Sequence, residues 1–134
     1  MRSKKINMCE FLKYSKTIAV VGISSNPDKT SRAIADFLLR KGYRVVGVHP
    51  KPFDIEGIPV YAKLTDIPFD IDIVDVFRRS ETIDEIIPDV LDKNPKALWL
   101  QLGIRNDKAV KPVVDNDIFV VQDECIKIVY NSCS

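Results

Sequence analysis

The residues whose types and spacing most clearly suggest chemistry form a short polar loop at positions 22–27. Gly22 ends an apolar, β-branched run, and serine, asparagine and proline follow it before an amphipathic segment begins. A buried strand that enters a helix through such a loop aims free backbone N–H groups and the positive end of the helix dipole at one point. This arrangement favours an anion, usually a phosphate. The same pattern also occurs in ordinary strand-to-helix connections, so both interpretations stay open here.

The loop lacks the glycine pattern of dinucleotide sites. Gly22 fits the first position of Gly-x-Gly-x-x-Gly, whereas Ser24 and Pro27 stand where the other glycines belong. NAD sites usually carry Asp or Glu at the end of the second strand, and this chain carries Lys51 there. A cation at that place would pair with a ribose phosphate, which indicates NADP or coenzyme A.

Basic residues follow the apolar runs along the chain. They are Lys29 and Arg32 after the first run, His49 and Lys51 after the second, Arg78 and Arg79 after the third, and Arg105 after the fourth. Right-handed crossovers bring such loops to one rim of a parallel sheet, so we expect a basic rim suited to a small polyanion. Lysine and arginine are also common in ordinary loops, which is the alternative interpretation. His49 has no carboxylate close in sequence, so we expect it to face the ligand or pack in a loop.

The runs that must position these residues read as strands alternating with helices. Expected strands cover residues 17–23, 44–48, 71–77, 97–102 and 118–121. Alternation of this kind predicts an α/β, Rossmann-like, three-layer fold with a mostly parallel five-stranded sheet and helices on both faces. If the chain starts in the middle and reverses after three strands, the order is 3-2-1-4-5. The ligand crevice then lies between the first and fourth strands.

The remaining segments carry more local predictions. Residues 1–16 are expected to form a helical lead-in, and 53–68 an irregular crossover with a brief extended piece at 60–61 and a helical turn at 64–67. Asp28, Thr30 or Ser31 is expected to cap the first helix, Ser80 and Asn106 the later ones. Pro88 predicts a kink or two short helices, and Pro112 a disturbance. We expect a left-handed residue at Asn116 and an edge strand or closing turn at 126–129.

Composition bounds the class of protein. The 134 residues fit one domain, 1–134, that needs no disulfide to hold it together, and 20 basic residues nearly balance 19 acidic ones. We therefore expect neither a nucleic-acid partner nor a membrane partner. The three cysteines, Cys9, Cys125 and Cys133, form no C-x-x-C pair and no metal set. With no apolar signal segment, a reducing cytoplasm is the predicted location.

Four stretches in order carry a family resemblance: VVGISSNPDKTS, VVGVHPK, IVDVFRRSE, and ALWLQLGIRND followed by DECIKI. The chain resembles the small stand-alone coenzyme A-binding proteins related to the N-terminal domain of the succinyl-coenzyme A synthetase α subunit. The resemblance implies a Rossmann-like sheet that binds coenzyme A at the rim. It implies no ligase chemistry, because the chain has no second domain and no region resembling that enzyme's phosphohistidine segment.

Carried over position by position, the resemblance implies a set of site residues. The phosphates would face Gly22, Ile23, Ser24, Ser25, Asn26 and the helix start at Thr30. Pro50 and Lys51 would lie by the nucleotide end, and Phe77, Arg78, Gln101, Gly103 and Ile104 would line the crevice. No catalytic residue and no metal ligand is implied.

The leading hypothesis is therefore non-catalytic binding of coenzyme A or acyl-coenzyme A. One alternative is a small NADP-dependent oxidoreductase, for which His49, Tyr61 and Cys125 are the candidate proton donors. Another is a redox-responsive regulatory protein in which the Cys125 thiol forms a mixed disulfide with coenzyme A, although a buried, inert Cys125 is the simpler interpretation. Sequence alone does not identify a protein partner or an oligomeric state.

Overall fold

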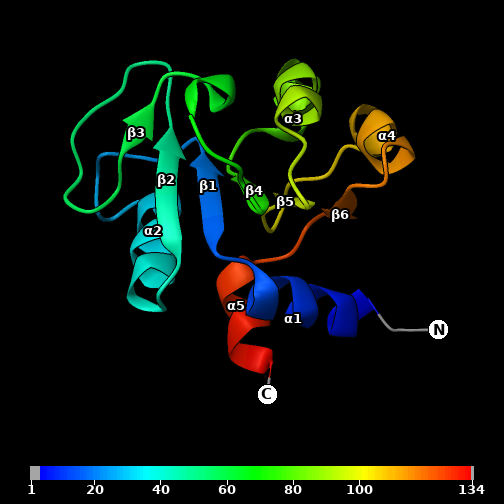
Figure 1. Ribbon diagram of the computed structural model, residues 1–134, viewed down its shortest axis with the longest axis horizontal. Coiled ribbons are helices and arrows are strands. Elements are labelled where there is room, and N and C mark those ends of the chain that lie inside the picture. Colours follow the sequence, from blue (N-terminus) through cyan, green and yellow to red (C-terminus); the bar gives the residue numbers. More distant parts are fainter. Residues whose placement is uncertain (1–3, 134) are drawn as a thin grey trace.

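A parallel sheet of six strands forms the middle layer of residues 4–133, which the computed structural model describes (Figure 1). The strands are β1 (Thr17–Val21), β2 (Arg44–Val48), β3 (Val60–Tyr61), β4 (Ile73–Val76), β5 (Ala97–Leu100) and β6 (Phe119–Val121). All neighbouring pairs are parallel, in the order β3-β2-β1-β4-β5-β6. The α/β class and the parallel sheet are confirmed.

The strand count and the placement of one strand differ from the prediction. The edge strand next to β2 is the two-residue β3, which was expected only as a brief extended piece. The run expected as the third strand, 71–77, forms β4 and pairs with β1 on its other side. The chain therefore reverses direction across the sheet between β1 and β4, not between β1 and the strand at 97–102. Long-range pairing decides this order, and no local pattern reports it.

Helices cover both faces of the sheet, as predicted (Figure 1). They are α1 (Lys4–Tyr14), α2 (Thr30–Arg40), α3 (Ile87–Lys93), α4 (Asp107–Asp115) and α5 (Ile126–Ser132), with 3₁₀ helices η1 (Leu64–Asp66) and η2 (Ser80–Ile86). The core beneath α1, α2 and α5 contains Ile18 and Val20 of β1, whereas Ala19 and Val21 pack on the side of α3 and α4. Alternate residues of one buried strand thus serve two cores, which explains its continuous apolar sequence.

The structure confirms some of the predictions made for the ends of the helices. The expected break at Pro88 is the junction of η2 and α3, where proline stands in the first turn and its missing N–H costs no helix bond. Asn106 caps α4 by accepting a hydrogen bond from Ala109 N at 3.0 Å. Pro112 lies inside α4, which continues to Asp115. The left-handed residue is Asp117, with φ 61°, and not Asn116.

The segment expected to close the sheet as an edge strand or turn at 126–129 is instead helix α5. Its first N–H, from Ile126, donates at 3.1 Å to the side-chain oxygen of Gln101, the residue that follows β5, which ties the start of the helix to the end of that strand. Ile126 and Val129, three positions apart, are both buried against the core.

A disulfide between Cys9 and Cys133 was not predicted. It joins α1 to the end of α5 across a sequence separation of 124, with the two Cα atoms 5.7 Å apart. Cys125 is the free cysteine of the described residues. The pairing is invisible in the spacing of the cysteines because it depends on the two ends of the chain meeting in space.

Candidate functional site

A cavity of about 600 Å³ opens at the carboxyl ends of β1 and β2, the edge where open α/β sheets bind ligands. Seven of the predicted site residues line it: Gly22, Ile23, Ser24, Ser25, His49, Pro50 and Arg78. Its lining also includes residues that the sequence analysis missed as site residues, chiefly Phe53, Lys63, Glu85, Ile86 and Asp89.

Backbone hydrogen bonds at Gly22 and the preceding residue tie the start of the loop to β2 on one side and to the end of β4 on the other. Its N–H donates to Val48 O of β2 at 3.0 Å, and Phe77 N, just past β4, donates to Val21 O at 2.8 Å. Gly22 has φ +86°, and a Cβ placed on it would lie 2.4 Å from the Phe77 carbonyl oxygen. Only glycine satisfies both the backbone angle and the contact, so the loop is fixed at the point where strand order reverses.

The loop and the helix start leave backbone N–H groups for a ligand. Asn26 N donates to the Ser24 hydroxyl and Asp28 N to the Asn26 side chain, each at 3.0 Å. Within residues 4–133, no acceptor receives the N–H of Ser24 or Ser25. The expected side-chain cap is also absent: Lys29 occupies the N-cap of α2 and makes no side-chain cap bond. The first-turn amides and the positive dipole end of α2 are therefore open to an anion.

The basic rim is less one-sided than expected, because its arginines pair with carboxylates. Arg78 contacts Glu85 at 3.0 Å, Arg79 contacts Glu81 at 3.5 Å, Arg105 contacts Asp107 at 3.1 Å and Arg32 contacts Asp36 at 3.2 Å. Arg32 also donates to Ser25 O at 2.9 Å, so it buttresses the loop. Lys29 and Lys51 are exposed and make no ion pair within the described part of the chain.

His49 is held as a loop residue. Lys51 N donates to its Nδ1 at 3.0 Å, and its ring meets Phe53 edge-on with centroids 5.2 Å apart. Nδ1 also lies 3.1 Å from Lys51 O, so the Lys51 backbone holds this side of the ring in either tautomer. Nε2 makes no hydrogen bond within the described residues and is the ring nitrogen left to meet a ligand.

The other predicted site residues lie outside the lining of this cavity: Asn26, Lys29, Thr30, Arg32, Lys51, Phe77, Arg79, Gln101, Gly103, Ile104 and Arg105. Gln101 is only 3% exposed and caps α5, so its role in the structure is internal. Gly103 and Arg105 belong to the turn after β5, which is tied to the Asp123 side chain at 2.6 Å and to the Ser80 hydroxyl at 3.0 Å. Ile23 is fully buried and packs in the core beneath α1, α2 and α5.

The sequence analysis missed these cavity-lining residues for physical reasons. Lys63 follows β3, which is too short to register as a strand in the sequence. Glu85 and Asp89 carry the spacing of a solvated helix surface, and only the packing of η2 and α3 beside the loop turns them toward the cavity. Their carboxylates add negative charge to the cavity that Arg78 lines. The prediction of a basic rim did not include this charge.

Other site types find little support in the described residues. No group of three or more His, Cys, Asp or Glu side chains within residues 4–133 is arranged to hold a metal ion. In the same residues, no helix is long and apolar enough to cross a membrane. Of the candidate proton donors for an oxidoreductase, His49 lines the cavity, whereas Tyr61 and Cys125 do not.

Comparison with known proteins identifies the family of the chain. Residues 16–131 match the CoA binding domain family. The chain belongs to that family. The uncharacterized protein YneT of Bacillus subtilis (strain 168) is 34% identical over 126 residues, which cover 94% of this chain and 93% of YneT.

Solved structures of similar proteins share the fold of this CoA binding domain over nearly its full length. The cell-free protein ID.343 from Thermus thermophilus is 31% identical with a TM-score of 0.92, covering 97% of this chain and 98% of that one. A hypothetical protein from Pyrococcus horikoshii OT3 is 28% identical with a TM-score of 0.91, covering 97% and 92%.

Proposed function

We propose that this protein binds coenzyme A or acyl-coenzyme A in the cavity at the ends of β1 and β2, without catalysing a reaction on it. The observation that carries the proposal is the loop at 22–26 with the uncapped start of α2, in a chain of the CoA binding domain family. Unpaired amides and a helix dipole are the elements with which proteins hold a pyrophosphate.

The cations supply the second part of the argument. Arg78 lines the cavity with a side chain that is 33% exposed, so its contact with a phosphate would be partly desolvated and stronger than a surface pair. Lys29, at the N-cap of α2, and Lys51, just past β2, make no ion pair within residues 4–133 and suit the additional phosphate of coenzyme A. The non-catalytic part of the proposal is supported by the cavity lining, in which Lys51 N holds His49 and, among the described residues, no nucleophile is hydrogen-bonded to a base.

The Arg78 and Glu85 pair makes the proposal sharply testable. Isothermal titration with coenzyme A should show binding that weakens with added salt, with NADP and NAD binding less tightly. Arg78→Gln should weaken coenzyme A binding about tenfold, as loss of one charge-assisted bond requires. Glu85→Gln should strengthen binding, because it removes the carboxylate that competes for Arg78.

Arg79→Gln is the matched control, since Arg79 is 82% exposed and lies outside the cavity lining. It should change the affinity less than about twofold. Equal effects of the two arginine variants would remove this cavity as the site. Preferential binding of NADP would favour the oxidoreductase alternative, and no binding of any of the three ligands would overturn the proposal.

A further inference from the structure

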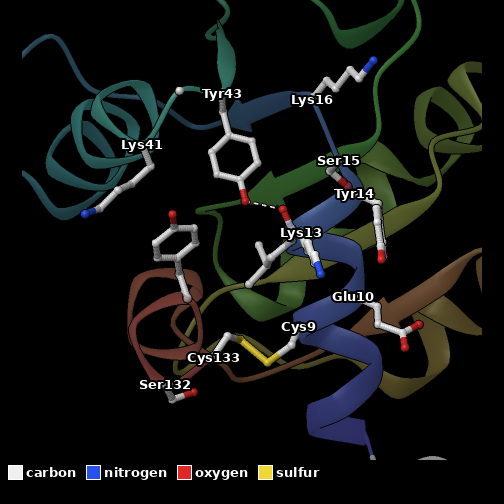
Figure 2. A pocket seen from close by; sticks show the side chains of 13 residues that line it. Cys9, Glu10, Lys13, Tyr14, Ser15, Lys16, Lys41, Tyr43, Ser132 and Cys133 are labelled. Atoms are coloured by element: carbon white, nitrogen blue, oxygen red, sulfur yellow. Dashed lines mark hydrogen bonds between the residues drawn. A yellow bond between two sulfur atoms is a disulfide. The ribbon is translucent and has the colours of Figure 1, made fainter.

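A second cavity, of about 880 Å³, lies at the opposite end of the sheet from the proposed ligand site. It is open to solvent and is lined by the second half of α1, the end of α5 and the turn that precedes β2 (Figure 2). Both cysteines of the disulfide are among its lining residues. Cys9 and Cys133 are each half-buried, which leaves the disulfide within reach of a small molecule in the cavity.

The cavity carries more positive than negative charge. Its lining contains Lys13, Lys16 and Lys41 against one carboxylate, Glu10. In Figure 2, Lys16 and Lys41 extend outward from the rim, and Lys13 lies on α1 one turn from Cys9. Burial and, secondarily, Tyr130 raise the pKa of Tyr43 to about 12, so this hydroxyl adds no negative charge. The wall therefore favours small anions.

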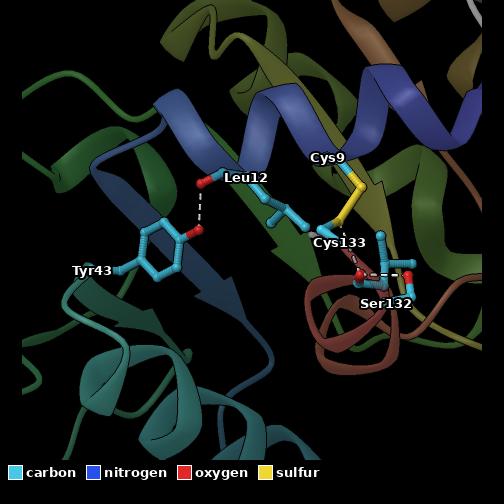
Figure 3. Close-up of a disulfide and its surroundings, with 6 residues drawn as sticks. Cys9, Leu12, Tyr43, Ser132 and Cys133 are labelled. Carbon is cyan, nitrogen blue, oxygen red and sulfur yellow. Dashed lines mark hydrogen bonds between the residues drawn. A yellow bond between two sulfur atoms is a disulfide. The ribbon is translucent and has the colours of Figure 1, made fainter.

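The two sulfur atoms have different electrostatic surroundings. Cys9 stands within α1, and Lys13 follows four residues later on the same helix face, with its ammonium 5.4 Å from the Tyr14 ring centroid, so it supplies positive charge about one turn from Cys9. Cys133 is the C-cap of α5, at the negative end of that helix, and its Sγ lies 3.1 Å from the Val129 carbonyl oxygen (Figure 3). A thiolate is stabilised beside a lysine and destabilised beside a carbonyl oxygen and a helix C-terminus. Cys9 is thus the better leaving thiolate.

We propose that this cavity is a site of reversible thiol–disulfide exchange with small anionic thiols. The incoming thiolate attacks Cys133 Sγ, the S–S bond breaks, and Cys9 leaves as a thiolate that takes a proton from water. The product is a mixed disulfide on Cys133 and a free thiol on Cys9. The Cys9 thiolate reverses the step by attacking Cys133 Sγ and expelling the small thiol. This site does not rest on the proposed coenzyme A site, which lies at the other end of the sheet.

The test compares three small thiols of different charge on the oxidised full chain. Mercaptoethanesulfonate is anionic, 2-mercaptoethanol is neutral and cysteamine is cationic, and intact mass follows the mixed disulfide. At low ionic strength, the rate per thiolate should be about tenfold higher for the anionic thiol than for the cationic one. High salt should reduce this ratio toward one. Tryptic peptides should place the adduct on Cys133, because Lys127 separates it from Cys125.

Lys13→Gln should lower the preference for the anionic thiol and shift part of the adduct to Cys9. Lys108→Gln on exposed α4 removes the same charge away from the cavity and should change neither result. Equal rates for the three thiols, an adduct mainly on Cys9, or identical behaviour of the two lysine variants would overturn the proposal. Two free thiols at Cys9 and Cys133 in the air-oxidised protein would overturn it as well.

Discussion

At the scale of single residues, two aspartates on or beside β4 have opposite electrostatic roles. Asp75 is fully buried, and neither carboxylate oxygen has a hydrogen-bond partner in the described part of the chain. Its neighbours across the sheet are Val20 and Trp99. Burial without a partner raises the pKa of Asp75 well above its usual range, so the folded state favours the protonated acid.

Asp72 lies in a different environment. It accepts hydrogen bonds from Lys16 N at 2.7 Å and Thr17 N at 3.1 Å, and Lys96 lies 3.4 Å away. Burial raises its pKa, but the two backbone bonds and Lys96 outweigh burial and leave the pKa of Asp72 below its usual value. Asp72 therefore favours the charged form and ties the entry of β1 to β4.

The two aspartates predict opposite dependences of stability on pH. The Asp75 contribution is fully present below its unfolded-state pKa and is lost as pH rises toward the folded one, so Asp75→Asn should gain stability relative to wild type as pH rises above 4. The difference should change by up to about 1.4 kcal/mol per pH unit. The Asp72 contribution is present above its unfolded-state pKa and lost as pH falls. Asp72→Asn should therefore destabilise at neutral pH and less in acid.

Urea unfolding of the three proteins at several pH values measures both effects. Parallel curves for wild type and Asp75→Asn would show that the Asp75 carboxyl does not titrate differently in the folded and unfolded states.

At the scale of elements, the turn between β1 and α2 depends on its close approach to the end of β4. The approach is set at Gly22, where the clash of a Cβ with the Phe77 carbonyl adds to the strain of a positive φ. Gly103, in the turn after β5, has nearly the same φ, +84°, but a Cβ there would meet nothing within 4 Å. Alanine substitutions at Gly22 and Gly103 therefore separate the cost of a positive φ from the cost of the clash with Phe77.

Gly103→Ala should cost about 1–2 kcal/mol of unfolding free energy, the strain of a left-handed alanine. Gly22→Ala should cost about 1–3 kcal/mol more, because β1 and β4 must also move apart. It should weaken coenzyme A binding too, since the loop amides move with the strand. Denaturant unfolding gives both free energies, and equal costs would show that the contact with Phe77 relaxes freely.

At the scale of the whole molecule, the disulfide ties the two ends of the chain into one structure. It closes a loop with a sequence separation of 124. The ring of Phe11 in α1 also stacks on the ring of Phe119 in β6, with the ring centroids 4.6 Å apart. A cytoplasmic location stays a prediction, and a disulfide of this kind is unusual in a reducing compartment.

Reduction of the disulfide should lower the free energy of unfolding by about 2–5 kcal/mol, because a long loop in the unfolded chain regains its entropy. Thermal unfolding with and without reductant measures the loss. In the double variant Cys9→Ser, Cys133→Ser, the reductant should have no effect, and an equal shift in that variant would assign the loss to something other than this disulfide.

Sequence by itself determined the family of this protein and part of its local structure. The apolar run before Gly22, the break at Pro88 and the cap at Asn106 depend on neighbours along the chain, so their patterns predicted strands and helix ends correctly. Only the tertiary structure decided the place of β4 beside β1, the pairing of Cys9 with Cys133 and the turn of Glu85 toward Arg78. These features join residues far apart along the chain or set the direction of a side chain, and the packing of whole elements selects them.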